Sequence, residues 1–241
     1  MSYDWLAAIV YIVLTIGVMR FGPWLVFKVP AFEQMRQLNR EVDQTKMSRN
    51  SFREAVEAHK KAGTWTRYAF YALLLPFCVC LERRPIGHCI LEIVAVLALF
   101  DLMYYLTHRF LFHGPLLREV HALHHQARKP TFIDAVYVHP VETIIGVSLF
   151  LLSIPIVAWI QGRPLNVVSA AIAAIVFMTI ATVNHTYVNL PRFPFKWLDN
   201  LTGIHAAHHL DMKHGNYATL TTVYDRLFGT YEKPVKRPTA A

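Results

Sequence analysis

Long apolar runs alternate with polar, basic segments along this chain. Residues 5–27 form the first run, and as a helix they are long enough to cross a hydrocarbon core of about 30 Å. Asp4 stands where a cleaved signal peptide would carry basic residues, and no A-x-A cleavage site follows. We therefore expect a retained membrane helix that ends near Gly22 and Pro23.

The next segment, residues 28–67, is polar and basic, with a weak apolar stripe that includes Phe52 and Val56. Two interpretations fit this pattern equally well: a helix lying on the membrane surface, or an ordinary solvated helix. In either case we expect His59 on the surface and outside any functional site.

Two further pairs of apolar runs predict two helical hairpins. The first joins residues 68–81 to 86–106 through the turn ERRP, and the second joins 144–160 to 165–183 through QGRP. Some of these arms are near the lower limit for a membrane span. Together with the first helix they predict an all-α, multi-span helical membrane bundle.

Composition narrows the class of protein. The 241 residues are 54% hydrophobic with a net charge of +8, and the mean hydropathy is +0.31. The basic residues flank apolar runs and no nucleic-acid motif occurs, so anionic lipid rather than nucleic acid explains the charge. Cys78, Cys80 and Cys89 lack C-x2-C spacing, which argues against a disulfide framework or a thiolate metal site.

Histidines cluster in three short motifs. An H-x2-HH spacing places its members at i, i+3 and i+4, which is one face of a helix, so three imidazoles can reach a common ion. Neutral imidazole suits iron, zinc, copper and nickel. Isolated histidines often only pack or cap, but the repeated spacing favours metal binding. The motifs are His108 with His113, then His121, His124 and His125, and finally His205, His208 and His209.

His108 and His113 are five residues apart, roughly 140° around an α-helix. We therefore expect them to serve two different ions or to straddle a helix end. If the basic segment 28–67 is cytoplasmic, as the positive-inside tendency suggests, each hairpin returns the chain to the cytoplasm. All histidine motifs then meet at one membrane face, as a cytoplasmic histidine-rich cap.

The ordered set HRFLFH, HALHH, HPVE, NH, HAAHH and YDRLFGTY lies between residues 108 and 231, within a region of similarity over roughly residues 95–235. It resembles the fatty acid hydroxylase and sterol desaturase superfamily of integral-membrane enzymes. On that resemblance, residues 67–241 are the catalytic domain, and residues 1–66 are an N-terminal membrane helix plus a basic interfacial segment. The resemblance implies two iron ions, with O2 as cosubstrate, and these metal ligands: His108, His113, His121, His124, His125, His185, His205, His208 and His209.

Some members of the superfamily carry a further ligand four residues before the position of His185, where this chain has Ala181. Three alternatives follow for that coordination position: it is open, it is filled by water, or His139 or His214 supplies an additional ligand. Asp101 and Asp211 are candidate hydrogen-bond acceptors for the ligating rings, since such rings usually donate their second N–H. For Asp101, a purely structural hydrogen bond between helices is an equal alternative.

The resemblance implies an oxygenase that uses two external electrons to hydroxylate or desaturate a lipid C–H bond. No cytochrome b5-like segment, flavin fingerprint or cysteine cluster occurs, so we expect a separate cytochrome b5-, ferredoxin- or reductase-type donor. The alternative is a membrane metal-binding protein or zinc carrier without oxidase chemistry, which predicts ionisable residues within several spans. The short chain, without a retrieval signal, fits a bacterial inner membrane better than the endoplasmic reticulum.

Overall fold

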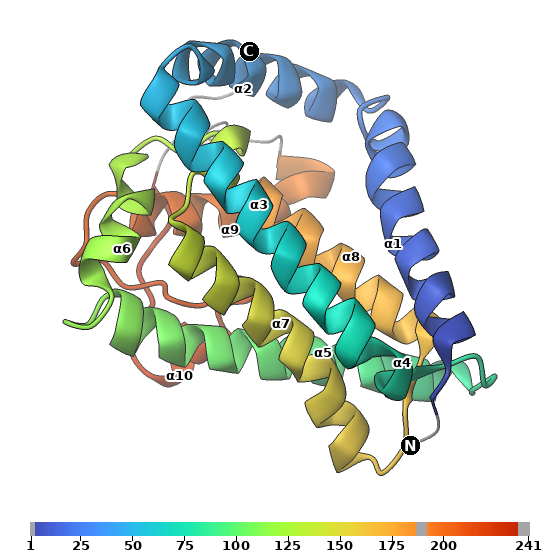
Figure 1. Cartoon of the computed structure of the whole chain (residues 1–241). Coiled ribbons are helices and arrows are strands. Elements are labelled where there is room, and N and C mark those ends of the chain that lie inside the picture. Colours follow the sequence, from blue (N-terminus) through green and yellow to red (C-terminus); the bar gives the residue numbers. More distant parts are fainter. Residues whose placement is uncertain (1–2, 187–191, 236–241) are drawn as a thin grey trace.

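The computed structural model describes residues 3–186 and 192–235, which are almost entirely helical (Figure 1). The long helices are α1 (Trp5–Val26), α2 (Pro30–Met47), α3 (Asn50–Leu73), α5 (Ile86–Thr107), α7 (Pro140–Ile160), α8 (Val167–Val183) and α9 (Arg192–His208). The short elements are α4 (Leu75–Cys78), β1 (Val79–Cys80), the π-helix η1 (His108–Phe112), α6 (Arg118–Ala122), the 3-10 helices η2 (His124–Gln126) and η3 (Phe132–Val136), β2 (Leu165–Asn166) and α10 (Val223–Leu227).

Three described helices are long and apolar enough to cross a membrane: α1, α5 with its π-helical extension, and α7. The apolar α8 is shorter, with 17 residues. The all-α membrane bundle predicted from hydropathy is therefore confirmed.

The segment between α1 and the first hairpin differs from the prediction. Residues 28–67 do not form one surface helix, because α2 ends at Met47 and α3 begins anew at Asn50. The expected first arm, residues 68–81, is the last part of α3 followed by α4 and β1. The domain boundary placed after residue 66 falls inside α3, and that division stays a prediction.

Local sequence explains where several helices begin. Pro30 and Pro140 occupy the first turns of α2 and α7, where the fixed φ of proline suits a helix and its missing N–H costs nothing. Asn166 caps α8, because its side-chain oxygen accepts hydrogen bonds from the backbone N–H groups of Val168 and Ser169. These caps fix the points at which the chain enters each helix.

The core lies where α5, α7 and α8 pack together. Phe150 and Phe177 stack with their ring centroids 4.4 Å apart, and Phe100 meets Phe177 edge-on at 4.7 Å. Burial of such aromatic side chains is a major source of packing energy. α1 lies along α8, and α3 crosses α7 (Figure 1).

The turns ERRP and QGRP, which join the arms of the two hairpins, lie together at one end of the bundle. We call this end the far end. β1 and β2 pair in parallel there, with Val79 opposite Leu165. The N–H of Asp4 donates to the carbonyl of Pro76, so the start of α1 lies at the same end. Arg84 and Glu92 form a buried ion pair beside these strands. The segments that carry the histidine motifs lie at the other end.

Candidate metal centre

All nine histidines named from the sequence as ligands come together in two buried groups. Within each group, one ring nitrogen per residue lies within 4.8 Å of the corresponding nitrogen of every other member. The five-histidine group consists of His108, His113, His121, His125 and His208, and the four-histidine group consists of His124, His185, His205 and His209. The predicted convergence of four separate segments on one end of the bundle is therefore what the structure shows.

A π-turn brings His108 and His113 into the same group. His113 N–H donates to the carbonyl of His108 at 2.9 Å, an i→i+5 bond that widens the helix. The two ring centroids are consequently 5.0 Å apart. The expectation of separate ions rested on α-helical geometry and does not fit, whereas the alternative of a helix end does. Gly114 permits the turn, since a Cβ there would lie 1.9 Å from the carbonyl oxygen of Phe110.

The Nε2 atoms within each group face one another at nearly constant spacing. In the five-histidine group, His108 Nε2 lies 3.0 Å from that of His121 and 3.1 Å from that of His208. In the four-histidine group, His205 Nε2 lies 3.1 Å from those of His185 and His209. With metal–nitrogen bonds of about 2.1 Å, ligands at right angles are about 3.0 Å apart, so the spacing suits shared ligation of an ion.

Tautomers provide an independent test of whether these residues fit a metal. His108 and His208 direct Nδ1 at the carbonyl oxygens of Tyr217 and Gly215, each at 2.7 Å. A carbonyl can only accept, so both Nδ1 atoms carry the hydrogen, and each neutral ring leaves a lone pair on Nε2. The two Nε2 atoms are 3.1 Å apart, so their lone pairs repel each other unless a cation lies between them.

The four-histidine group repeats this arrangement. His124 donates from Nδ1 to the carbonyl of Tyr137, and His185 donates from Nδ1 to that of Ala181. Their bare Nε2 atoms then face each other at 3.1 Å. In the five-histidine group, His113 also has a buried Nε2 without a hydrogen-bond partner in the described chain. The donor set in both groups therefore fits a metal ion.

Burial keeps these rings neutral, as ligation requires. Desolvation lowers the pKa of His121 from 6.5 to about 3, and burial together with His121 lowers that of His113 to about 4. Desolvation also lowers the pKa of the remaining rings that lie outside the spanning helices: His124, His125, His185, His205, His208 and His209. At neutral pH these rings are uncharged and available to bind a cation.

The other residues named from the sequence take different positions. His139 accepts a hydrogen bond from the N–H of Val141 at the start of α7, and His214 contacts Asp211 at 2.9 Å. Neither histidine belongs to a group. Asp101 accepts hydrogen bonds from Thr219, Leu220 and Thr221, a structural contact of α5 with the segment before α10 rather than with another helix. In the described chain, neither aspartate is bonded to a member of the two groups.

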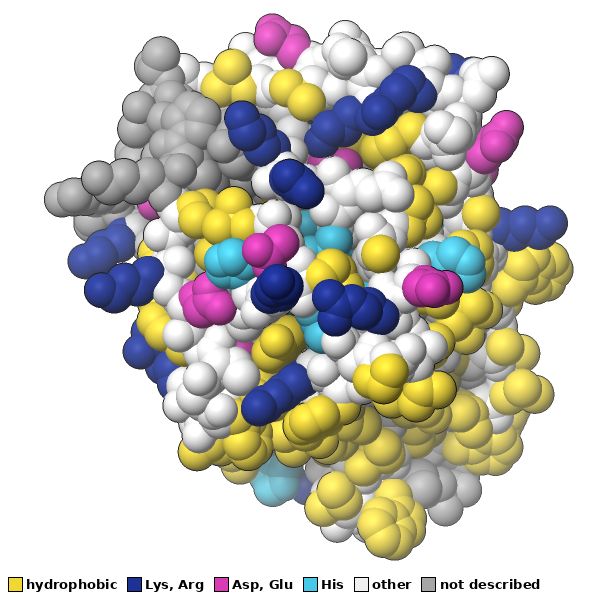
Figure 2. Space-filling view, turned by 90° about the vertical axis from the view of Figure 1, so that its left-hand side faces the viewer, with side chains coloured by type: hydrophobic (Ala, Val, Ile, Leu, Met, Phe, Trp, Pro, Cys, Tyr) yellow, Lys and Arg dark blue, Asp and Glu magenta, His cyan; other side chains and the backbone are white. Residues whose placement is uncertain are grey.

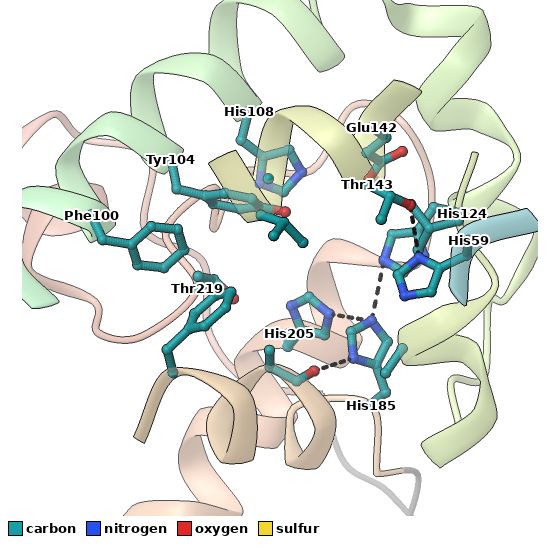
Figure 3. Close-up of a pocket in the computed structure, with 16 residues that line it drawn as sticks. His59, Phe100, Tyr104, His108, His124, Glu142, Thr143, His185, His205 and Thr219 are labelled. Atoms are coloured by element: carbon teal, nitrogen blue, oxygen red, sulfur yellow. Dashed lines mark hydrogen bonds between the residues drawn. The ribbon is translucent and has the colours of Figure 1, made fainter. Parts of the chain in front are cut away.

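A cavity of about 140 Å³ opens beside the four-histidine group (Figure 3). His124, His185 and His205 line it, together with Phe100 and Tyr104 of α5 and residues of α7. The cavity gives a small molecule access to this group. Its walls are largely apolar, so it suits a hydrocarbon segment.

The sequence analysis did not place two residues that lie beside the histidine groups. His59 was expected on the surface, but it lines the cavity and its Nδ1 lies 2.7 Å from Thr143 Oγ1. Glu142 was quoted only as part of HPVE, yet its Oε1 lies 2.8 Å from His121 Nδ1. Only the packing of α3 on α7 reveals the first contact, whereas the HPVE motif offered a signal for the second.

Comparisons with known proteins extend these observations. The family model "Fatty acid hydroxylase" matches residues 93–230. Methylsterol monooxygenase 1 of Rattus norvegicus is 30% identical over 140 residues, which cover 54% of this chain and 43% of that protein. Delta(7)-sterol 5(6)-desaturase of Leptosphaeria maculans is 31% identical over 145 residues, which cover 60% of this chain and 38% of that protein.

A third relative is fatty acid hydroxylase domain-containing protein 2 of Macaca fascicularis. It is 26% identical over 152 residues, which cover 63% of this chain and 42% of that protein. The chain thus spans less than half the length of these three curated relatives. No solved structure matches it significantly.

Fold and site together define an integral-membrane helical protein with a buried centre rich in histidine. The chain belongs to the fatty acid hydroxylase family, as the matched region of more than half its length shows. The resemblance inferred from the histidine motifs is thereby confirmed.

Proposed function

We propose that this protein is a membrane-bound di-iron oxygenase that uses O2 and two external electrons to hydroxylate or desaturate a lipid C–H bond. The observation that carries the proposal is the pair of histidine groups whose bare Nε2 atoms converge beside an apolar cavity. Membership of the fatty acid hydroxylase family supports the same chemistry.

In this proposal the five-histidine group holds one iron and the four-histidine group holds the other. When bound, the irons supply oxidising power from O2 that side chains alone lack. The ligand set is nitrogen-rich, unlike the glutamate-based sets of soluble di-iron bundles. The chain's own contribution is to keep the rings neutral through burial and to fix their orientation through the Nδ1 hydrogen bonds.

The cavity positions the substrate and limits access of water. Phe100 and Tyr104 give it an aromatic side against which a hydrocarbon packs, and His185 and His205 of the four-histidine group lie on an adjacent side (Figure 3). Phe177 also lines the cavity. Exclusion of water also protects reactive species from side reactions. The names of two relatives refer to sterols, so we propose sterols as the first class of lipid to test.

Electrons come from a separate donor of the cytochrome b5, ferredoxin or reductase type. Exposed basic residues flank the histidine-bearing segments: Arg118, Arg128, Lys129 and Lys213. Figure 2 shows Lys and Arg side chains over this face, with histidine visible between them. Such a surface would attract an acidic redox protein by electrostatic steering.

We further propose that the histidine groups face the cytoplasm of a bacterium, with the protein in the inner membrane. The junction of the basic helices α2 and α3 lies at the same end of the bundle as the histidines. The ion pair between Lys46, near the end of α2, and Asp134 of η3 places it there. This agrees with the positive-inside tendency. Residues 67–241 would form the catalytic domain.

A zinc carrier without oxidase chemistry is disfavoured, because both histidine groups lie at one end of the bundle rather than along a path through it. The test is metal analysis and O2 uptake of purified protein, with mass spectrometry of lipids from expressing and non-expressing cells. We expect iron, and lipid-dependent O2 uptake only when a reductase system is added. Gain of oxygen by a lipid would indicate hydroxylation, and loss of a hydrogen pair would indicate desaturation. Exchangeable zinc without O2 uptake would refute the proposal.

A further inference from the structure

One side of the cavity carries a buried carboxylate oxygen that has no partner. Glu142 is only 5% exposed, and its Oε1 is engaged with His121 Nδ1. Its Oε2 makes no hydrogen bond within the described chain, although Glu142 lines the cavity. A buried carboxylate oxygen without a donor is costly, so this site favours a ligand that supplies an O–H or N–H group.

His59 and Thr143 lie on the same side of the cavity (Figure 3). His59 Nδ1 lies 2.7 Å from Thr143 Oγ1, and that hydroxyl is also 3.2 Å from the carbonyl of His139. This contact fixes the ring, while its Nε2 makes no hydrogen bond within the described chain. Gly63, one turn further along α3, also lies against Thr143, since a Cβ there would be 3.4 Å from Thr143 Cγ2.

The opposite side of the cavity is aromatic, formed by Phe100 and Tyr104, and His185 and His205 lie between the two sides (Figure 3). A ligand in this space meets polar atoms on one side and hydrocarbon on the other. It also lies beside the four-histidine group. Beside the hydrocarbon that its largely apolar walls suit, the cavity therefore offers polar partners to a head group.

We propose that the cavity binds a lipid through a free hydroxyl group, held between Glu142 Oε2 and His59, close to the carbon that reacts. A hydroxyl can donate to the carboxylate and at the same time accept from Nε2–H of His59, in the tautomer whose Nδ1 accepts from the Thr143 hydroxyl. A fatty-acid carboxylate or an ester carbonyl has no hydrogen to donate, and its oxygens would face those of Glu142. The inference rests on the proposed function for the reaction itself, but binding can be tested separately.

The experiment measures binding to the full-length, metal-loaded protein in detergent. The probes are two matched pairs: cholestanol with its methyl ether, and hexadecanol with its methyl ether. We expect at least one free alcohol to bind roughly tenfold or more tightly than its ether, the effect of one lost hydrogen bond to a charged group. His59→Phe and the nearly isosteric Thr143→Val should shrink this preference. His88→Phe, at an exposed histidine of the far end, should retain it.

Equal binding of alcohol and ether in both pairs would overturn the inference, as would absence of alcohol binding. A His59→Phe protein that folds, by its thermal midpoint, and keeps the full preference would overturn it too. O2 uptake on the same samples separates the two proposals. Alcohol preference without lipid-dependent O2 uptake would leave the hydroxyl site standing and refute the oxygenase. O2 uptake driven equally by lipids without a hydroxyl would support the oxygenase and refute the hydroxyl site.

Discussion

The Nδ1 atom of His121 lies 2.8 Å from Oε1 of Glu142, and both side chains are buried. The same imidazole presents Nε2 to that of His108 at 3.0 Å. A carboxylate on the far nitrogen of a ligating histidine fixes its tautomer and increases its basicity. α7 thus supplies no ligand to the five-histidine group, yet it orients one of its members.

Glu142→Gln should weaken metal binding while preserving the shape of the site. The amide oxygen can still accept from His121, but the negative charge is lost, and substitutions of this kind typically cost about 10–100-fold in metal affinity. Competition of the purified protein with a chelator measures the change. Glu119→Gln, an exposed glutamate on the helix that carries His121, is the matched control and should leave the affinity unaltered.

Removing one ring from either group should empty that group selectively. His208→Ala alters the five-histidine group and His205→Ala the four-histidine group, so each variant should retain about half of the wild-type metal content. Elemental analysis of purified protein provides the count.

His139→Asn and His214→Asn test the two additional ligands considered from the sequence. Both residues lie outside the groups, so these variants should keep the full metal content. Loss of metal from either variant would show that the ligand set extends beyond the nine histidines.

The metal-free protein should lose stability as the pH falls below about 6.5. The pKa of His121 is lowered to about 3 and that of His113 to about 4, both by burial. Below the ordinary value of 6.5 the unfolded chain takes up protons that the folded chain refuses, so the free energy of unfolding decreases. Each such histidine contributes up to roughly 1.4 kcal/mol per pH unit until its folded pKa is reached.

Thermal unfolding of chelator-treated protein across this range provides the measurement. The midpoint should be level above about pH 7 and fall below it, and a level midpoint throughout would contradict the buried, neutral rings. Bound metal should hold the midpoint higher, since it binds only the folded state. His88→Asn should show the same pH curve as the wild type.

The sequence allowed prediction of the bundle and of the histidine convergence because both depend on simple counting. Long apolar runs indicate spanning helices, and counting them as five crossings put every histidine motif on one side. The convergence agrees with that count, although only three of the described helices are long and apolar enough to cross a membrane. For His108 and His113 the spacing left separate ions and a helix end as alternatives, because a π-turn cannot be read from spacing. The spacing of the two histidines does not reveal that the helix widens into a π-turn at this point.

His59 could not be found from the sequence for a different reason. Its role follows from the contact with Thr143, which lies 84 positions away. Residues 28–67 looked like a surface segment because their apolar stripe is weak, but α3 crosses α7 and turns one polar side chain inward. Tertiary packing, rather than local pattern, decided which face of this helix is buried.

The far end of the bundle should be a separate source of stability, independent of the metal centre. The side chains of Arg84 and Glu92 are 3% and 2% exposed and form an ion pair. Glu92 also accepts hydrogen bonds from Gln161 and from the N–H of Asn166, so it joins both inter-helix turns. Removing one partner of a buried pair leaves an uncompensated charge, which typically costs about 3–5 kcal/mol.

Arg84→Met and Glu92→Gln should therefore each lower the thermal midpoint markedly. The double variant should lose less than the sum of the single losses, because neither charge is then left without its partner. Lys60→Met, at an exposed ion pair with Glu57, is the control and should change stability by less than about 1 kcal/mol. Metal content should stay at the wild-type value in every folded variant, because the pair lies at the opposite end from the histidines. A parallel loss of metal would show instead that the two ends of the bundle are coupled.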